Sequence, residues 1–332
     1  MTAELGAIAA AIEAGESVRG TTSPNPPVGC ALIDASGELI ATGATSPAGG
    51  PHAEINALRD AGERARGATA VVTLEPCNHT GRTGPCSQAL VEAGIARVVY
   101  FTADPNDAAA GGAEYLRSHG VEVDFQPVRI AALQPWLRSV YHNRPSVTLK
   151  FASTLDGFTA ATDGTSKWIT GDEARELTHE DRAKLDAIIV GTGTAIADDP
   201  SLTARFPDGT LRGHQPRRVV VGTREVPEGN LTRLGFEQYA TPQEALEALW
   251  NTGARDVLVE GGATLAASFL EQDLVDAVQA YIAPALLGAG RGVLDRAIAG
   301  TIADARRFRT TLVQPVGGDV FIEMERDVYG TR

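Results

Sequence analysis

The stretch from residue 51 to residue 86 decides how the first half of this chain folds. It reads PHAE at residues 51–54, TLEPC at 73–77 and PC at 85–86. A catalytic zinc ion typically takes three protein ligands and keeps a fourth position for water. His52, Cys77 and Cys86 are suitable ligands, and Glu54 is a free carboxylate beside them. We therefore predict a catalytic zinc site in which Glu54 moves protons between the activated water and a leaving group.

The pattern is typical of zinc enzymes that deaminate nucleobases, in which His-x-Glu is followed by Pro-Cys-x-x-Cys. Here eight residues separate Cys77 from Cys86, so the loop is longer than in that pattern. Two other interpretations stay open, namely a structural zinc site with Cys30 as fourth ligand, and inert buried cysteines. Structural zinc sites usually contain paired Cys-x-x-Cys motifs, and this sequence has none, so a catalytic site is favoured.

Length and composition set limits on the protein class. A chain of 332 residues suggests two domains. The net charge of −13 argues against non-specific binding to nucleic acid. Two of the three cysteines are assigned to zinc, which implies no disulfide framework and predicts a cytoplasmic protein. The first 20 residues lack a basic segment leading into an apolar one, and no apolar run reaches 18 residues, so we expect neither a signal peptide nor a membrane span.

Hydrophobic patterns in the first half alternate between helix and strand. Helices are expected over residues 3–16, 52–64, 86–93, 111–119 and 130–142. Strands are expected over 28–33, 70–74, 97–101 and 121–125, and a further strand, which forms a hairpin with 28–33, should end near residue 42. This alternation predicts a three-layer α/β sandwich for residues 1 to about 144. His52 and Glu54 would lie about 200° apart on a regular helix, so the zinc site should be at the first turn. Cys86 at a helix N-terminus favours the thiolate.

A joint at residues 143–145 separates this pattern from a second α/β segment. Strands are expected over 147–152, 186–191, 218–222, 257–260, 277–284, 310–314 and 319–324. Helices are expected over 173–184 and 241–250, and a third helix should follow the strand 257–260 and end at residue 270. The rest of residues 203–240 gives no clear prediction. Gly261 and Gly262 end a strand before a helix, where backbone N–H groups can approach a phosphate. A simple packing turn is an equally good interpretation.

Taken together, the motifs resemble those of the bifunctional riboflavin-biosynthesis deaminase/reductase family, and the resemblance covers almost the whole chain. The matching blocks are PNPPVG at 24–29, PHAE at 51–54, TLEPC at 73–77 with PC at 85–86, TLDG at 154–157, SKWIT at 166–170, ADDP at 197–200, VEGG at 259–262 and IAP at 282–284. The long loop before Cys86 separates this family from cytidine and tRNA deaminases. The resemblance implies a cytidine-deaminase-like α/β sandwich over residues 1–144 and a dihydrofolate-reductase-like α/β domain over 145–332.

The family's chemistry implies two steps. The deaminase would release ammonia from 2,5-diamino-6-(5-phosphoribosylamino)pyrimidin-4(3H)-one, with Zn²⁺ and Glu54. The reductase would then use NADPH to reduce the ribosyl side chain, giving 5-amino-6-(5-phosphoribitylamino)uracil. The resemblance also implies a homo-oligomer, dimer or tetramer, formed through the second half.

Three alternatives compete with this assignment. They are a zinc deaminase with an inactive reductase-like half, a nucleic-acid-editing deaminase, and a non-enzymatic protein with structural zinc and a ligand-sensing second half. The net charge of −13 and the lack of interleaved aromatic and basic residues argue against the second.

Position by position, the resemblance assigns roles to many residues. His52, Cys77 and Cys86 would bind zinc, and Glu54 would be the proton shuttle. The substrate positions would be Asn25, Arg82, Asp104 and Asn106 in the deaminase, with Arg82 toward phosphate, and Ser166, Arg182, Leu202, Arg205 and Glu260 in the reductase. The NADPH positions would be Ala152, Trp168, Thr194, Asp198, Thr223, Gly262, Ala263, Thr264, Leu265, Ala266, Ala267 and Ser268.

The sequence departs from the family pattern at three positions. Thr45 stands where a histidine is usual, Asp107 where a second proline is common, and Gly222 where Asp is frequent before the Thr223 position. None of them is an expected zinc ligand. We therefore expect activity to survive, with weaker substrate binding in the deaminase because Thr45 removes one phosphate contact.

Overall fold

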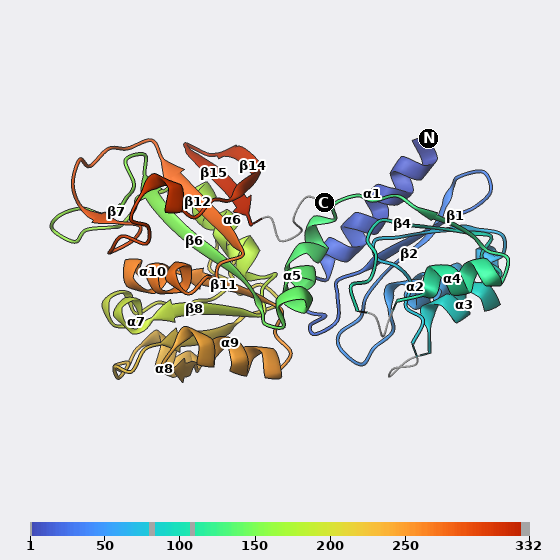
Figure 1. The fold of residues 1–332 in the computed structure, drawn as a ribbon, viewed down its shortest axis with the longest axis horizontal. Helices are drawn as coiled ribbons and strands as arrows, with labels where there is room; N and C mark the ends of the chain where they lie inside the picture. Colours follow the sequence, from blue (N-terminus) through green and yellow to red (C-terminus); the bar gives the residue numbers. More distant parts are fainter. Residues whose placement is uncertain (1, 80–83, 107–109, 327–332) are drawn as a thin grey trace. The chain divides into compact units, whose positions relative to one another are not determined.

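The computed structural model describes residues 2–79, 84–106 and 110–326 (Figure 1). Contacts divide the chain into two compact units, Met1–Tyr141 and His142–Arg332. Each unit is built around its own mixed sheet, so the predicted pair of α/β domains is confirmed as a fold class. The boundary drawn at residue 144 from the sequence stays a prediction. Among the described residues, no helix is both long and apolar enough to cross a membrane.

The first unit has a five-stranded sheet in the order β2-β1-β3-β4-β5. Its strands are β1 (Gly29–Ile33), β2 (Leu39–Ala44), β3 (Thr69–Val72), β4 (Arg97–Tyr100) and β5 (Glu122–Phe125). Its helices are α1 (Thr2–Ser17), α2 (Ala53–Ala61), α3 (Cys86–Glu92), α4 (Gly112–Ser118) and α5 (Gln134–His142), with 3₁₀ turns at Gly62–Ala65 and Ala131–Leu133. β1 pairs antiparallel with β2 and β3, whereas β3, β4 and β5 run parallel.

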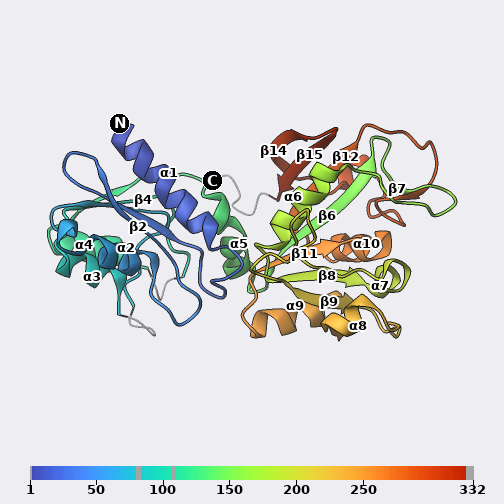
Figure 2. The same ribbon diagram turned by 180° about the vertical axis from the view of Figure 1, so that it is seen from behind.

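Two glycines show that α1 and α2 cover opposite faces of this sheet. A Cβ on Gly29 would lie 1.9 Å from the Ala11 carbonyl oxygen of α1, and one on Gly43 would lie 2.2 Å from the Ala53 carbonyl oxygen of α2. Gly43 pairs with Cys30, the neighbour of Gly29, so the two glycines face opposite sides. The result is the predicted three-layer arrangement, which is visible from both sides in Figures 1 and 2.

The second unit has an eight-stranded sheet in the order β10-β9-β8-β11-β6-β12-β15-β14, beside a two-stranded β13-β7 sheet. Its strands are β6 (Ser146–Thr154), β7 (Phe158–Ala160), β8 (Ala187–Gly191), β9 (Arg217–Val221), β10 (Glu237–Tyr239), β11 (Asp256–Glu260), β12 (Ala277–Ala283), β13 (Arg291–Gly292), β14 (Arg309–Val316) and β15 (Asp319–Glu325). Its helices are α6 (Asp172–Arg182), α7 (Thr192–Asp198), α8 (Asn230–Leu234), α9 (Pro242–Asn251) and α10 (Ala263–Glu271), with a 3₁₀ turn at Ile302–Asp304.

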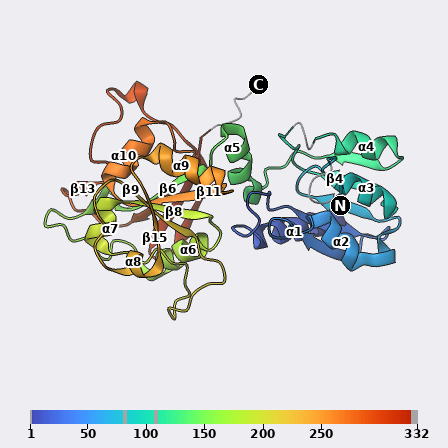
Figure 3. The same cartoon turned by 90° about the horizontal axis from the view of Figure 1, so that it is seen from below.

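Alternating apolar side chains build a core on each face of this second sheet. Ile189 of β8 packs with Leu249 of α9 and Phe269 of α10. Its neighbour Ile188 points the other way and packs with Leu231 of α8. Figure 3 shows α9 and α10 on one side of the strands and α6, α7 and α8 on the other. Six consecutive strands of the sheet, from β10 to β12, are parallel, and β15 and β14 close it with antiparallel pairing.

The structure also contains elements that the sequence patterns did not predict. Thr192, Gly193 and Thr194, which follow the predicted strand 186–191, form the first turn of α7. Besides the predicted strand β9, residues 203–240 hold α8 and β10. The short strands β7 and β13 pair with each other across more than 130 residues of sequence.

Candidate functional site

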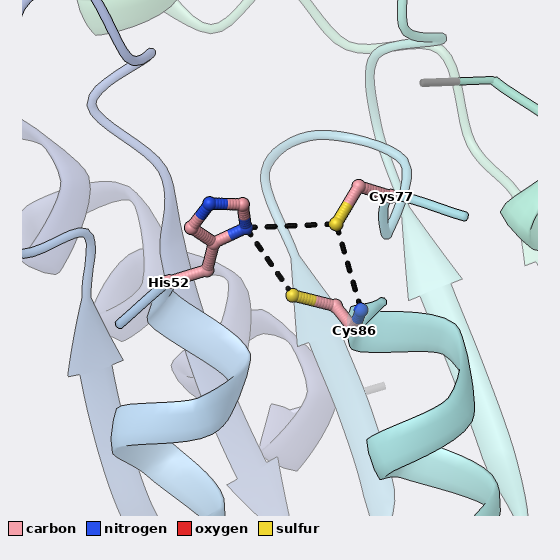
Figure 4. A group of neighbouring side chains, drawn as sticks. All are labelled: His52, Cys77 and Cys86. Carbon is pink, nitrogen blue, oxygen red and sulfur yellow. Dashed lines mark hydrogen bonds between the residues drawn. The ribbon is translucent and has the colours of Figure 1, made fainter. Parts of the chain in front are cut away.

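Two helix starts and one turn bring the predicted zinc ligands together (Figure 4). His52 is the residue before α2, with extended backbone angles of φ −74° and ψ 167°. Cys86 is the first residue of α3, and Cys77 lies in the turn that follows β3. Pro51 precedes the N-cap residue of α2, and Pro85 is itself the N-cap residue of α3. The structure therefore places two of the three predicted ligands at helix starts.

The distances between these three side chains fit a tetrahedral zinc ion. The His52 Nδ1 atom lies 3.5 Å from Cys77 Sγ and 3.4 Å from Cys86 Sγ. All three ligand atoms lie within 4.8 Å of one another. Tetrahedral zinc with bonds of about 2.1 Å to nitrogen and about 2.3 Å to sulfur separates such atoms by about 3.6 Å. Cys30 is not a member of this group, so the described residues offer three ligands and leave a position open.

The side chains of the two cysteines interact directly with each other. Hydrogen bonding from Cys86 lowers the pKa of Cys77 to about 4 and outweighs the effect of burial. The same hydrogen bond and burial raise the pKa of the Cys86 thiol. The backbone N–H of Cys86 also donates to Cys77 Sγ over 3.5 Å. A thiolate already stabilised by N–H groups at a helix start is a good ligand for a divalent cation.

Glu54 lies one residue inside α2 and is only 4% exposed. Burial, followed by the charge of Cys77, raises the pKa of Glu54 to about 7. A carboxyl group that titrates near neutral pH can both accept and return a proton, as a general acid–base catalyst must. The chemistry of this group therefore matches the predicted proton shuttle.

The other deaminase positions lie on loops. Asn25 is half-buried, and its loop is held by Trp136, whose Nε1–H donates to the Pro24 carbonyl over 3.1 Å. Asp104 follows β4; burial raises the pKa of its carboxyl, which accepts from the backbone N–H of Asn106 over 2.9 Å. Asn106 itself is exposed. Arg82 and Asp107 lie outside the described residues. These four substrate positions stay predictions.

Thr45, which replaces the family's usual histidine, has a structural contact instead. Its side chain is 3% exposed, and its Oγ1 accepts from the backbone N–H of Val28 over 3.2 Å. Its own backbone N–H donates to the Val28 carbonyl over 3.0 Å. The hydroxyl therefore ties the start of β1 to the end of β2.

The second unit contains a cavity of about 930 Å³ at the ends of β8, β9 and β11. Cofactor and ligand pockets usually measure about 300–1,000 Å³, so the cavity can hold a dinucleotide. Gly261 and Gly262 both have positive φ angles, 80° and 83°, and a Cβ on Gly262 would lie 3.0 Å from Thr194 Oγ1. This glycine turn at the start of α10 gives a phosphate close access to backbone N–H groups. The residues present therefore fit NADPH.

A smaller cavity of about 260 Å³ shares Thr194, Asp198 and Gly262 with the larger one. Arg182 and Glu260 line it and form an ion pair. Lys150 of β6 also lines it, and burial lowers the pKa of this lysine while the charge of Glu260 opposes the change. From the sequence alone, the Lys150 side chain could face either the active site or solvent. A lone lysine in the apolar strand of residues 147–152 was the signal that could have found it.

The structure brings most of the predicted reductase residues to these two cavities and leaves a few outside. The smaller cavity is lined by Ala152, Arg182, Leu202, Glu260 and Ala266, the larger by Ser166, Thr264, Leu265 and Ser268, and both by Thr194, Asp198, Gly262 and Ala263. Among the described residues, four predicted positions lie outside both linings. Trp168 is 71% exposed, and Arg175 is stacked on it. Arg205 and Thr223 are exposed, whereas Ala267 is buried. Arg224, next to Thr223, lines the larger cavity and was not predicted.

Comparisons with known proteins agree on both halves of the chain. Residues 145–321 match the RibD C-terminal domain, and residues 2–102 match the cytidine and deoxycytidylate deaminase zinc-binding region. The chain is 59% identical to riboflavin biosynthesis protein RibD of Corynebacterium ammoniagenes, over 90% of this chain and 91% of the relative. It is 44% identical to RibD of Mycobacterium tuberculosis over 96% of each. The solved deaminase/reductase of Thermotoga maritima is 32% identical, with a TM-score of 0.86 and coverage of 98% and 99%.

Proposed function

Because the chain belongs to the RibD family of bifunctional riboflavin-biosynthesis enzymes, we propose that its two reactions take place at the His52–Cys77–Cys86 group and at the paired cavities of the second unit. The protein is a zinc-dependent deaminase and an NADPH-dependent reductase. It deaminates 2,5-diamino-6-(5-phosphoribosylamino)pyrimidin-4(3H)-one and then reduces the ribosyl chain to give 5-amino-6-(5-phosphoribitylamino)uracil. An inactive reductase half is not favoured.

In the deaminase, Glu54 performs the proton transfers. When bound, zinc lowers the pKa of water so that it can attack at neutral pH. The Glu54 carboxylate takes a proton from the attacking water and delivers it to the departing amine, which leaves as ammonia. The buried position of Glu54, two residues after His52, is the observation that supports this role. Asn25, Asp104, Asn106 and Arg82 are proposed to hold the substrate.

In the reductase, the charged groups of the smaller cavity handle the proton. When bound, NADPH supplies a hydride to the open-chain sugar carbon. Reduction of the imine also adds one proton to the nitrogen, and the Lys150 ammonium is in the cavity to supply it. The Arg182–Glu260 pair orients the sugar, and Ser166, Leu202 and Arg205 complete the proposed substrate positions. The predicted cofactor positions that line the cavities, including the glycine turn at Gly262, are proposed to contact NADPH. Trp168, Thr223 and Ala267 lie outside both linings and stay predictions from the resemblance.

The assignment is tested by following ammonia release and NADPH oxidation in parallel on the same full-length protein. We expect both from the wild type on the diaminopyrimidinone substrate. Glu54→Ala should lose ammonia release and keep NADPH oxidation on substrate that is already deaminated. Unchanged ammonia release in this variant would contradict the role of Glu54. Absence of NADPH oxidation by the wild type would contradict the reductase assignment.

Three further features are proposed for the whole protein. The deaminase is assigned to residues 1–144 and the reductase to 145–332. Three free cysteines and no predicted disulfide support a cytoplasmic location. A homo-oligomer through the second unit is supported by the edge strand β14, where Leu312 and Val313 are 41% and 60% exposed. Light scattering of Val313→Lys against the wild type tests this, because a smaller mass is expected for the variant.

A further inference from the structure

Arg224 lies at the end of the larger cavity that is remote from the substrate pocket. The substrate pocket is lined by Lys150 of β6 and Glu260 of β11. Across the sheet, the strands β6, β11, β8 and β9 are neighbours in that order. Arg224 comes shortly after β9 in the sequence. Neighbouring strands lie about 4.8 Å apart, so β9 is about 14 Å from β6 across the sheet. A dinucleotide with its nicotinamide at the substrate therefore extends its adenosine end toward Arg224.

The guanidinium of Arg224 is held in place, and among the described residues it has no charged partner. Its Nε–H donates to Thr192 Oγ1 over 3.3 Å. Its Nη2 lies 3.1 Å from where a Cβ on Gly193 would be, so the side chain crosses the start of α7. Within the described part of the chain, no carboxylate forms an ion pair with Arg224. Gln238 of β10 fixes the loop by donating to the carbonyls of Gly222 and Arg224 over 2.7 and 2.8 Å.

Gly222 keeps negative charge away from this arginine. It also lines the larger cavity, and its φ angle is 126°. A Cβ there would lie 2.7 Å from Thr192 Oγ1, so this backbone excludes a side chain. In dinucleotide sites a carboxylate near the adenosine ribose binds the 2′-hydroxyl of NADH, whereas an arginine accommodates the 2′-phosphate of NADPH. Gly222 and Arg224 together create the second situation.

We propose that Arg224 makes this reductase select NADPH over NADH by pairing with the 2′-phosphate of the cofactor. The planar guanidinium fork can bind two phosphate oxygens at once. The inference rests on the proposed function in one respect, that the cofactor occupies the larger cavity. The second arginine of that cavity, Arg291, is placed differently, since its carbonyl accepts from Thr159 Oγ1 and Thr159 lines both cavities. Arg291 therefore lies toward the nicotinamide end.

The test is a calorimetric titration of the full-length protein with NADP⁺ and with NAD⁺. Arg224→Gln should weaken NADP⁺ binding about 10- to 100-fold, the range for losing a hydrogen-bonded charge, and change NAD⁺ binding less than about threefold. Arg224→Lys should fall between the wild type and the glutamine variant, because it keeps the charge without the fork. The matched control is Arg233→Gln on α8. Arg233 is not among the described residues that line either cavity, so this variant should behave as wild type. Steady-state kinetics should show a raised KM for NADPH and a kcat at saturation within about twofold of wild type.

The outcomes separate the inference from the function on which it rests. An Arg224→Gln variant that keeps the wild-type ratio of NADP⁺ to NAD⁺ affinity overturns the role of Arg224 and leaves the reductase assignment intact. Equal weakening of both cofactors also overturns it, because the arginine would then contact a part that they share. Failure of the wild type to bind either cofactor would refute the reductase assignment itself.

Discussion

Arg182 and Glu260 are joined by two parallel hydrogen bonds of 2.7 Å, from Nε to Oε1 and from Nη2 to Oε2. The pair connects the end of α6 with the end of β11. Its side chains are 14% and 10% exposed, so water screens them little. Since Glu260 occupies the guanidinium fork, Lys150 is left as the cation of this cavity with no hydrogen bond or ion pair to the described residues. Its nearest aromatic partner is the Tyr281 ring, 5.2 Å from the ammonium.

The buried pair predicts a pH-dependent contribution to stability. Glu260→Gln should lower the free energy of unfolding at pH 7 by about 3 kcal/mol, because Arg182 would keep a buried charge without its partner. Burial alone would raise the pKa of Glu260, but Arg182 outweighs it and holds that pKa at about 2, against an ordinary 4.5. A lowered pKa stabilises the fold above the ordinary value, and the gain is lost as pH falls through the folded value. Urea denaturation should show the full difference at pH 6–7 and a shrinking one below about pH 4.5.

Glu237→Gln is the matched control for this measurement. Arg217 and Glu237 make the same forked contact, with bonds of 2.8 and 2.7 Å, but their side chains are 33% and 36% exposed. An exposed pair of this kind contributes about 0–1 kcal/mol, so this variant should lose far less stability. Equal losses in the two variants would show that burial of the Arg182–Glu260 pair has no special effect.

Lys150→Met is expected to slow NADPH oxidation on deaminated substrate by about 10²- to 10⁴-fold, the usual contribution of a positioned proton donor. Burial lowers the pKa of Lys150, which brings the ammonium closer to donating at neutral pH. Ammonia release and NADP⁺ affinity should not change. Lys184→Met, two residues after the end of α6, serves as the control and should keep its rate. A Lys150 variant with wild-type turnover would exclude the lysine as proton donor.

Glu54→Gln should lower kcat for ammonia release by about 10²- to 10⁴-fold while zinc content stays at the wild-type level. Glutamine keeps the size of the side chain but cannot carry the proton. Zinc is measured by elemental analysis on the same sample as the rate. Glu63→Gln, on the exposed 3₁₀ turn after α2, is the control and should be fully active. Loss of zinc together with activity would instead make Glu54 a ligand.

Cys77→Ser should reduce bound zinc from about one ion per chain to nearly none, since zinc prefers thiolate and imidazole donors and only two such ligands would remain. Ammonia release should disappear and NADPH oxidation should persist, because the cavities belong to the other unit. Cys30→Ala tests the remaining cysteine, whose pKa is raised by burial and which should not be required for zinc. Zinc loss in the Cys30 variant would restore the structural four-ligand alternative.

The zinc ligands were predictable because their chemistry is carried by rare residue types in a short segment. His52, Cys77 and Cys86 fall within 35 residues, and helix periodicity located two of them at helix starts. The buried strands were predictable for a different reason, since most of them are short apolar runs. What the sequence could not give was pairing between distant short segments, such as β7 with β13, because two or three residues carry no recognisable period.

The reductase pocket was predictable only in part. Resemblance located the glycine turn at Gly262 and the partners Arg182 and Glu260, but it could not say that the two would bond to each other. It also left Lys150 undecided and missed Arg224, because a lysine on a strand or an arginine in a loop is usually solvated. Only the neighbouring strands decide whether such a charge faces a cavity. Trp168 stays a predicted cofactor position; its ring is largely exposed, and Arg175 stacks on it.

Asp276 decides where the chain can be divided if the two activities are to be produced as separate proteins. Its side chain is 2% exposed, and it accepts from both terminal nitrogens of Arg144, over 2.7 and 2.8 Å, and from the backbone N–H of Val147 over 2.8 Å. A reductase gene fragment that starts at Pro145 would discard Arg144 and also His142, whose Nε2 lies 3.5 Å from Asp276 Oδ1, and would leave this buried carboxylate without these two partners. One that starts at His142 keeps both. A separately produced reductase should therefore begin at His142, three residues before Pro145, so that it keeps Arg144.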